Sequence, residues 1–121
     1  MKTKVLTVDD SRTIRNMLLV TLNNAGFDTV QAEDGMEGLE VLEESNPDVI
    51  VTDINMPRLD GFGFIEGVRQ NERYRSVPIL VLTTESDDEK KNRARQAGAT
   101  GWIVKPFEPT KLVSAIERVT A

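Results

Sequence analysis

The 121-residue sequence contains no cysteine and no histidine. Without cysteine, the chain has no disulfide, no thiol nucleophile and no zinc–thiolate site. Without histidine, it also lacks the imidazole group, which is a common metal ligand and the most frequent general acid or base. Any chemistry of this chain must therefore depend on carboxylate, amide, hydroxyl and amine groups.

Positive charge and long apolar stretches are scarce as well. The chain has 20 acidic and 15 basic residues, for a formal net charge of -5 at pH 7. This balance argues against a protein that binds the phosphate backbone of nucleic acids. The apolar run Val5–Val8 is too short for a secretion signal, and no run reaches the roughly 18 residues of a membrane span. We therefore expect a cytoplasmic protein with no membrane or nucleic-acid contact.

Short apolar runs alternate with amphipathic segments, and the length fits one domain, residues 1–121. The runs are continuous and rich in β-branched residues, which is typical of strands buried on both faces of a parallel sheet. They are Val5–Val8, Thr29–Ala32, Val49–Thr52, Ile79–Leu82 and Trp102–Val104. Strands that each precede a helical segment predict an α/β fold, in which helices cover both faces of a parallel sheet.

The amphipathic segments carry the start and stop signals of helices. Apolar residues repeat at helical spacing in the first segment, and Gly26 follows it where a helix commonly ends. Ser86 and Glu89 match a capping box at the start of the fourth segment, and Pro109 fits the first turn of the fifth. The predicted helices include Ile14–Ala25, Leu39–Leu42, Phe62–Val68, Ser86–Ala97 and Pro109–Val119.

Polar side chains follow four of the five predicted strands. They are, in chain order, Asp9 and Asp10, Asp53 and Asn55, Thr83 and Thr84, and Lys105. Each has an ordinary explanation alone, because aspartate often caps helices or occupies turns and lysine is commonly solvated. The carboxyl ends of parallel strands lie at one edge of a sheet, however, so these side chains should share one crevice. The ordinary explanations would have to hold at every one of these strand ends, which favours a functional site.

Three neighbouring carboxylates, Asp9, Asp10 and Asp53, cannot all stay ionised without a counter-charge. Mg²⁺ supplies such a charge and typically binds one or two carboxylates together with water and phosphate oxygens. Zinc is disfavoured because the chain has neither histidine nor cysteine. A carboxylate beside Mg²⁺, facing a lysine and hydroxyl groups, is suited to phosphoryl transfer in which the aspartate becomes an acyl phosphate.

The same residues resemble the signature of response-regulator receiver domains, and the resemblance extends from the first strand to the last helix. The matching segments are Asp9-Asp10, Asp53-Ile54-Asn55-Met56-Pro57, Asp60-Gly61, Thr83 and Lys105-Pro106-Phe107. The resemblance implies a flavodoxin-like (βα)5 fold with the strand order 2-1-3-4-5. It also implies Mg²⁺ as the cofactor and a cis peptide bond between Lys105 and Pro106.

The resemblance assigns roles to the acidic residues. Asp53 would accept the phosphoryl group, while Asp10, Asp53 and the backbone carbonyl of Asn55 would bind Mg²⁺ directly and Asp9 would act through water. Asn55 lies two residues past Asp53, and Glu85 lies two residues past Thr83. This pair of residues resembles the pair in the chemotaxis regulators, whose acyl phosphate hydrolyses quickly. We therefore expect these two side chains to tune dephosphorylation in a phosphoacceptor that is not a turnover enzyme.

The remaining roles concern phosphate binding and switching. Thr83 and Lys105 would each contact a phosphoryl oxygen. Trp102 stands in the last predicted strand, where the family often has tyrosine or phenylalanine. Because Thr83 ends one strand and Trp102 begins the next, we expect the two to be neighbours, so that movement of the hydroxyl lets the indole ring move.

The implied partners are a histidine kinase, as phosphodonor, and an output protein such as a component of the flagellar motor switch. The output protein would bind the face formed by the fourth helix, the fifth strand and the fifth helix. The sequence ends at Ala121, just past the fifth predicted helix, which fits a single-domain regulator of chemotaxis or motility.

The residues alone leave other functions open. A phosphorelay intermediate or a phosphate sink would use the same strand-end residues. A Mg²⁺-dependent phosphatase that forms an aspartyl phosphate generally has a second acid two residues past the nucleophile, where this chain has Asn55. A flavin-binding electron carrier would need a hydroxyl- or glycine-rich phosphate loop after the first strand, where Asp9 and Asp10 would repel phosphate.

Overall fold

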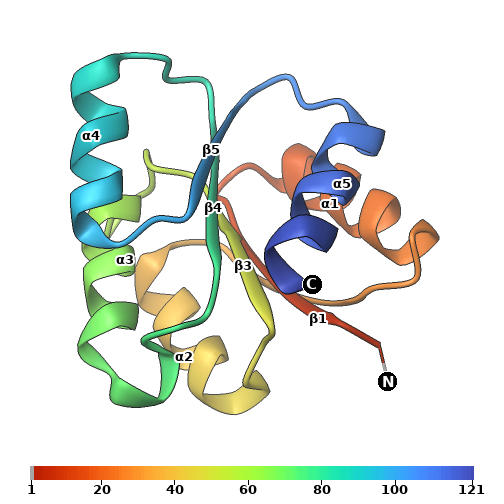
Figure 1. Cartoon of the computed structure of the whole chain (residues 1–121), viewed down its shortest axis with the longest axis horizontal. Helices are drawn as coiled ribbons and strands as arrows, with labels where there is room; N and C mark the ends of the chain where they lie inside the picture. The colour runs from red at the N-terminus through yellow and green to blue at the C-terminus, as the bar shows by residue number, and fades with distance from the viewer. Residues whose placement is uncertain (1) are drawn as a thin grey trace.

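A computed structural model describes residues 2–121 and shows one parallel sheet between two layers of helices (Figure 1). The strands are β1 (Lys4–Val8), β2 (Asp28–Ala32), β3 (Val49–Thr52), β4 (Ile79–Thr83) and β5 (Gly101–Val104). They are hydrogen-bonded in the order β2-β1-β3-β4-β5, which confirms the predicted fold class and strand order. The order reverses between β1 and β3, and ligands of open α/β sheets bind outside the carboxyl ends of the strands at such a point.

The helices divide between the two faces of the sheet. On one face lie α1 (Arg12–Asn24) and α5 (Pro109–Thr120), as the orange and dark-blue ribbons of Figure 1 show. The other face is covered by α2 (Gly35–Ser45), α3 (Gly61–Gln70) and α4 (Asp88–Ala97), and a short 3-10 helix, η1 (Glu72–Tyr74), follows α3. Among the helices of residues 2–121, none is both long enough and apolar enough to span a membrane.

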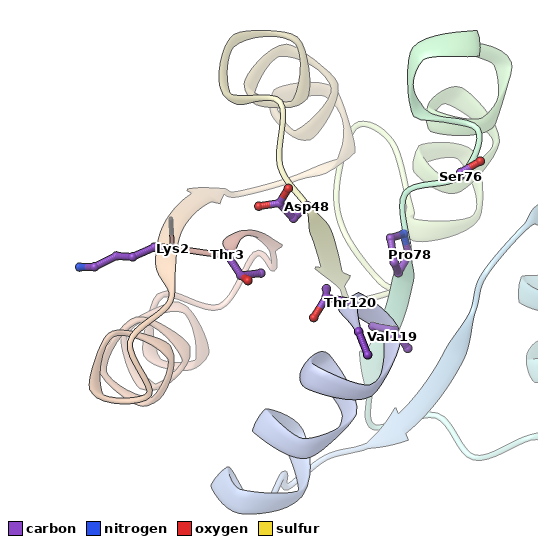
Figure 2. Close-up of a pocket in the computed structure, with 8 residues that line it drawn as sticks. Lys2, Thr3, Asp48, Ser76, Pro78, Val119 and Thr120 are labelled. Atoms are coloured by element: carbon purple, nitrogen blue, oxygen red, sulfur yellow. The ribbon is translucent and has the colours of Figure 1, made fainter.

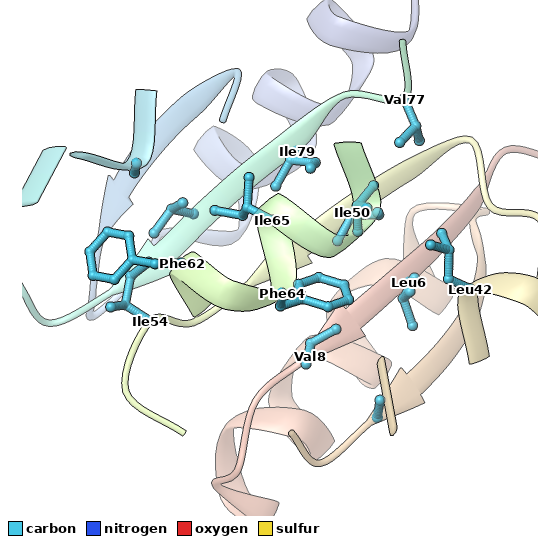
Figure 3. Close-up of a cluster of buried hydrophobic side chains, with 14 of the residues drawn as sticks. Leu6, Val8, Leu42, Ile50, Ile54, Phe62, Phe64, Ile65, Val77 and Ile79 are labelled. Atoms are coloured by element: carbon cyan, nitrogen blue, oxygen red, sulfur yellow. The ribbon is translucent and has the colours of Figure 1, made fainter. Parts of the chain in front are cut away.

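The central strands explain the continuous apolar runs of the sequence, because every residue of β3 and β4 is buried. Each face of the sheet has its own core, and Figure 3 shows the one beneath α2, α3 and α4. Its large side chains include Leu6, Leu42, Ile50, Phe62, Phe64, Ile65 and Ile79. Full burial of one such side chain stabilises the fold by about 1.5–3 kcal/mol, so the sheet is a rigid support for the loops at its edge.

The α4 helix is attached more weakly than its neighbours. Ala94 is its single fully buried residue, and Ala97 packs partly against the core, which confirms the two predicted inward residues. The guanidinium carbon of Arg93 lies 4.1 Å from the centroid of the Phe62 ring of α3, in the geometry of a cation–π contact. Helix α4 therefore contacts the core through few apolar atoms.

The predicted cap of α4 was wrong by one residue. The N-cap is Asp87, whose carboxylate accepts a hydrogen bond from the Glu89 N–H at 2.8 Å, so Ser86 does not head a capping box. Aspartate caps at least as well as serine, and its charge also interacts favourably with the positive end of the helix dipole. In α1 the predicted stop is confirmed, since Gly26 follows the helix with a φ of 89°.

Candidate functional site

The acidic residues predicted to converge lie together at the carboxyl edge of the sheet. Val8 of β1 pairs with Thr52 of β3, so the next residues, Asp9 and Asp53, emerge from adjacent strands. Carboxylate oxygens of Asp9, Asp10 and Asp53 all lie within 4.8 Å of one another. Asp9 and Asp53 are only 2% and 8% exposed, whereas Asp10 is open to solvent. Such an all-oxygen set of ligands fits a hard divalent cation such as Mg²⁺.

Lys105 reaches this cluster from the loop after β5. Its Nζ donates hydrogen bonds to Oδ2 of Asp9 at 2.7 Å and to Oδ2 of Asp53 at 2.9 Å, with its side chain 9% exposed. Burial alone would lower the pKa of Lys105, but the two carboxylates outweigh burial and raise that pKa overall. The ammonium therefore stays charged. The Lys105–Pro106 peptide bond is cis, as the resemblance implied.

Asp9 is held from several sides. Its Oδ1 accepts a hydrogen bond from the Ser11 N–H at 2.9 Å, and its backbone carbonyl accepts one from Nη1 of Arg15 at 2.8 Å. Burial raises the pKa of Asp9, and its hydrogen bonds to Lys105 and Ser11 oppose this rise without cancelling it. The contribution of Arg15 was not predicted, because an arginine on the partly exposed side of a helix shows no distinctive sequence pattern.

The loop between β3 and α3 turns sharply next to Asp53. The Asp53 N–H donates to the Val8 carbonyl at 2.9 Å, and the Ile54 N–H donates to Oδ1 of Asp53 at 2.6 Å. The Gly61 N–H then donates to the Ile54 carbonyl at 2.7 Å and closes the loop. A β-carbon on Gly61 would collide with the Asp53 carbonyl oxygen and lie 2.7 Å from Cα of Ile54. Glycine is required at this position because any larger residue would push the loop away from Asp53.

The two residues predicted to tune dephosphorylation, Asn55 and Glu85, contact each other across the site. Nδ2 of Asn55 donates to Oε1 of Glu85 at 3.1 Å, and Nζ of Lys90 lies 3.1 Å from Oε2 of the same carboxylate. The Asn55 hydrogen bond, followed by the Lys90 contacts, lowers the pKa of Glu85. These contacts connect the loop after β3 with the loop after β4 and the start of α4. The sequence analysis predicted Asn55 and Glu85 but not Lys90.

Thr83 and Trp102 lie on adjacent strands, as predicted, but they are not directly opposite each other. Thr83 pairs with Val104 and Trp102 pairs with Val81, so the two lie diagonally on adjacent strands. The structure connects them through Glu85 instead. Nε1 of the half-buried Trp102 donates to the Glu85 backbone carbonyl at 3.0 Å, while the Glu85 N–H faces Oγ1 of the buried Thr83 at 3.4 Å.

A separate hollow of about 480 Å³ lies at the opposite edge of the sheet (Figure 2). It is lined by residues from both ends of the chain and by the segments that enter β3 and β4, including Thr3, Asp48, Pro78 and Thr120. The Asp48 carboxylate already accepts a hydrogen bond of 2.8 Å from the Lys4 N–H. The polar groups of this hollow do not converge in the way that the acids and Lys105 do.

Comparison with known proteins agrees with the site. A family model of the response regulator receiver domain matches residues 5–117. The chemotaxis protein CheY of Pseudomonas aeruginosa is 38% identical over 117 residues, which cover 96% of this chain and 94% of that protein. A probable transcriptional regulator, ycf27 of Porphyridium aerugineum, is 37% identical over 118 residues. That match covers 98% of this chain and 48% of the algal protein, so the chain spans about half the length of that relative.

Solved structures with the same fold include two bacterial receiver proteins. The chemotaxis protein CheY4 of Vibrio cholerae is 46% identical with a TM-score of 0.95, and the match covers 98% of this chain and 99% of that one. The receiver domain of the sensor histidine kinase PA1611 of Pseudomonas aeruginosa has a magnesium ion coordinated in its active site cleft. It is 26% identical with a TM-score of 0.92, and the match covers 99% and 98% of the two chains. On its sequence, its fold and the matched family model, this chain belongs to the response regulator receiver domain family.

Proposed function

We propose that this chain is a phosphorylation-activated response regulator of a two-component system, in which Asp53 accepts a phosphoryl group from a histidine kinase. The observation that carries this proposal is the position of Lys105. Its ammonium is shared between Asp9 and Asp53 inside a cluster of three carboxylates. A buried ammonium at this point balances the charge of the carboxylates beside it and can bind the oxygens of an incoming phosphoryl group.

The proposed chemistry has two steps. A carboxylate oxygen of Asp53 attacks the phosphorus atom, so that an O–P bond forms while the bond from phosphorus to the donor breaks. The donor atom, an imidazole nitrogen in a phosphohistidine, leaves with the bonding electron pair. The ammonium of Lys105 and the hydroxyl of Thr83 donate hydrogen bonds to the phosphoryl oxygens, where negative charge accumulates. Water later attacks phosphorus, phosphate leaves, and the free Asp53 carboxylate returns, so the chain resets itself without being a turnover enzyme.

The proposed Mg²⁺ ligands are Asp10, Asp53 and the backbone carbonyl of Asn55, with Asp9 acting through water. When bound, Mg²⁺ supplies positive charge that neutralises phosphoryl oxygens. The all-oxygen cluster supports this assignment, as does the magnesium ion of the PA1611 receiver domain.

The proposed output is phosphorylation-dependent binding of another protein in chemotaxis or motility. Two of the relatives that match this chain almost from end to end, CheY of Pseudomonas aeruginosa and CheY4 of Vibrio cholerae, are chemotaxis proteins, which supports that pathway. The proposed binding face consists of α4, β5 and α5, with a flagellar motor switch component as the kind of partner expected. Affinity capture with and without beryllofluoride, a phosphoryl mimic, tests this output. A protein retained only with beryllofluoride supports a signal, whereas capture of a histidine phosphotransfer protein alone would indicate a phosphorelay.

Phosphoryl transfer is tested by incubation with acetyl phosphate and Mg²⁺, followed by measurement of intact mass. The wild type should gain one phosphoryl group, and Asp53→Asn should gain none. Asp60→Asn is the matched control, because Asp60 caps α3 by accepting a hydrogen bond from Gly63 and asparagine caps equally well. Undiminished labelling of Asp53→Asn would contradict the assignment, and rapid turnover of phosphate esters by the wild type would favour a phosphatase.

A further inference from the structure

The tip of the loop between β3 and α3 is tied to the start of α2 by an ion pair that no sequence motif indicates. Nε and Nη2 of Arg58 donate to Oδ2 and Oδ1 of Asp34 at 2.8 and 3.0 Å. A paired contact of this kind fixes the orientation of both groups. The Asp34 side chain is 9% exposed although that of Arg58 is 60% exposed, so one member of the pair has a fixed, nearly buried position.

Asp34 is itself held in place by α2. Its Oδ1 also accepts a hydrogen bond from the Glu37 N–H at 2.9 Å, which caps the helix. The next residue, Gly35, donates its N–H to the Leu59 carbonyl at 3.1 Å, and a β-carbon on Gly35 would lie 2.5 Å from that oxygen. Two consecutive residues at the start of α2 therefore contact two consecutive residues of the loop, Arg58 and Leu59.

The backbone of Arg58 adopts a conformation that arginine rarely occupies. Its φ is 64°, and the Leu59 N–H donates to the Pro57 carbonyl at 2.7 Å, which closes a tight turn around Arg58. Glycine would fit such a turn without steric cost, and asparagine tolerates it better than arginine does. What arginine adds at this position is a side chain long enough to reach Asp34.

The loop is thus held at two points. At its base, the Gly61 N–H is bonded to the Ile54 carbonyl, and at its tip Arg58 is bonded to Asp34. Asn55 lies between these points, and its only side-chain hydrogen bond within residues 2–121 goes to the carboxylate of Glu85, outside this loop. The path of the backbone at Asn55 therefore depends on whether the tip stays fixed.

From this arrangement we infer that Arg58 is a positioning residue for the metal site, which acts through Asp34 to hold the Asn55 backbone carbonyl beside the acidic cluster. The inference rests on the proposed function, because it assumes that this carbonyl binds Mg²⁺. The side-chain hydrogen bonds of Arg58 within residues 2–121 go to Asp34 and not to the acidic cluster. Its effect is on the affinity of the site, through the conformation of the loop.

The test uses the metal-free protein, MgCl2 as the probe, and an NMR titration that follows backbone amides to give the dissociation constant. Second-layer partners of metal ligands typically change affinity by 10–100-fold, and Arg58 is one step further away. We therefore expect Arg58→Gly and Asp34→Asn each to raise the dissociation constant by about threefold to tenfold. The double variant should be no worse than the single variants, because the pair acts as one unit.

Thermal unfolding without metal separates positioning from a purely structural role. Arg58→Gly relieves the unfavourable φ and also loses the ion pair with Asp34, so the two effects offset and its melting temperature should change little while its Mg²⁺ affinity falls. Arg75→Gln is the control, because Arg75 lies outside this loop and forms an exposed ion pair, in which its Nη2 is 3.7 Å from Oε1 of Glu72. This variant should bind Mg²⁺ with the wild-type affinity. Wild-type affinity in both Arg58→Gly and Asp34→Asn would overturn the inference. A wild-type protein that binds no Mg²⁺ would instead overturn the proposed function.

Discussion

Trp102 and Glu85 are joined by a hydrogen bond of 3.0 Å from the indole Nε1 to the backbone carbonyl. The Glu85 side chain accepts a hydrogen bond from Asn55, and its N–H faces the hydroxyl of Thr83. One residue of the loop after β4 thus contacts two residues of the proposed phosphorylation site and the only tryptophan of the chain. A change in this loop must alter the surroundings of the indole.

This relationship predicts that Trp102 fluorescence reports activation. When the Thr83 hydroxyl turns toward a phosphoryl oxygen, its contact with the Glu85 N–H is lost and the loop becomes free to move. Beryllofluoride with Mg²⁺ should therefore shift the emission maximum or intensity of the wild type. Thr83→Ala should greatly reduce this change and still bind Mg²⁺, since Thr83 is not among the proposed ligands. Identical spectra in both states, together with partner binding that still requires phosphorylation, would remove Trp102 from the mechanism.

A second prediction concerns metal and stability. Mg²⁺ relieves repulsion among Asp9, Asp10 and Asp53, and a ligand present at about 100 times its dissociation constant stabilises the native state by about 2.7 kcal/mol. Asp10→Ala removes one repelling charge and one ligand, and Asp10 is exposed, so packing is little affected. Its metal-free melting temperature should rise and its response to Mg²⁺ should disappear. A wild-type melting temperature unmoved by millimolar Mg²⁺ would argue against a metal site.

A third prediction concerns acid stability. The Arg58 hydrogen bonds, followed by that of Glu37, lower the pKa of Asp34 below its ordinary value of 3.8. The unfolded chain then binds this proton at a higher pH than the folded chain does. The stabilisation is complete well above pH 3.8 and is lost as the pH falls through the lower, folded pKa. Asp34→Asn keeps the helix cap but removes this contribution, so it should be less stable than the wild type at neutral pH.

Urea unfolding at several pH values checks that expectation. The difference in unfolding free energy between the wild type and Asp34→Asn should shrink as the pH is lowered through the acid range. A difference that is constant with pH would show that the charge of the Asp34 carboxylate does not contribute to stability.

A fourth prediction compares two glycines. Gly61→Ala places a methyl group against the carbonyl of Asp53, and overpacking of this kind costs about 1–3 kcal/mol or more. It should also slow phosphorylation by acetyl phosphate, because the backbone of Asp53 must shift. Gly26→Ala is the control: its φ is positive, but no atom lies within 4 Å of the added carbon. That variant should lose only about 1 kcal/mol of unfolding free energy. It should be phosphorylated at the wild-type rate, as measured by intact-mass spectrometry of samples quenched at successive times.

Much of the fold was predictable because the central strands are buried on both faces, so their sequences are continuous runs of apolar residues. The position of the site followed from these strands, because parallel strands bring the residues at their carboxyl ends, among them Asp9, Asp53 and Thr83, to one edge of the sheet whatever the details of the loops. The types of side chain at that edge then favoured Mg²⁺ binding and phosphoryl transfer, because they offer carboxylate, amide, hydroxyl and amine groups and neither histidine nor cysteine. The prediction succeeded where position depends on topology rather than on exact conformation.

The errors arose where an offset of one or two residues matters. The strand β5 begins at Gly101, one residue before its predicted start, and its register places Trp102 opposite Val81 and diagonal to Thr83. Composition places a strand but does not fix its register against a neighbour at the edge of the sheet. Arg15 and Arg58 were missed for another reason, because a long side chain reaches its partner only once the backbone of both segments is known.

The scarcity of buried residues in α4 has a consequence for how such a protein diversifies. With Ala94 as its one fully buried residue, α4 should open locally at low free-energy cost, and its amide hydrogens should exchange with solvent sooner than those of α3. If α4 forms part of the proposed binding face, substitutions on its exposed surface would change partner recognition while leaving the sheet and the acidic edge intact. The proposed phosphorylation chemistry and the proposed partner specificity would then be encoded in separate sets of residues.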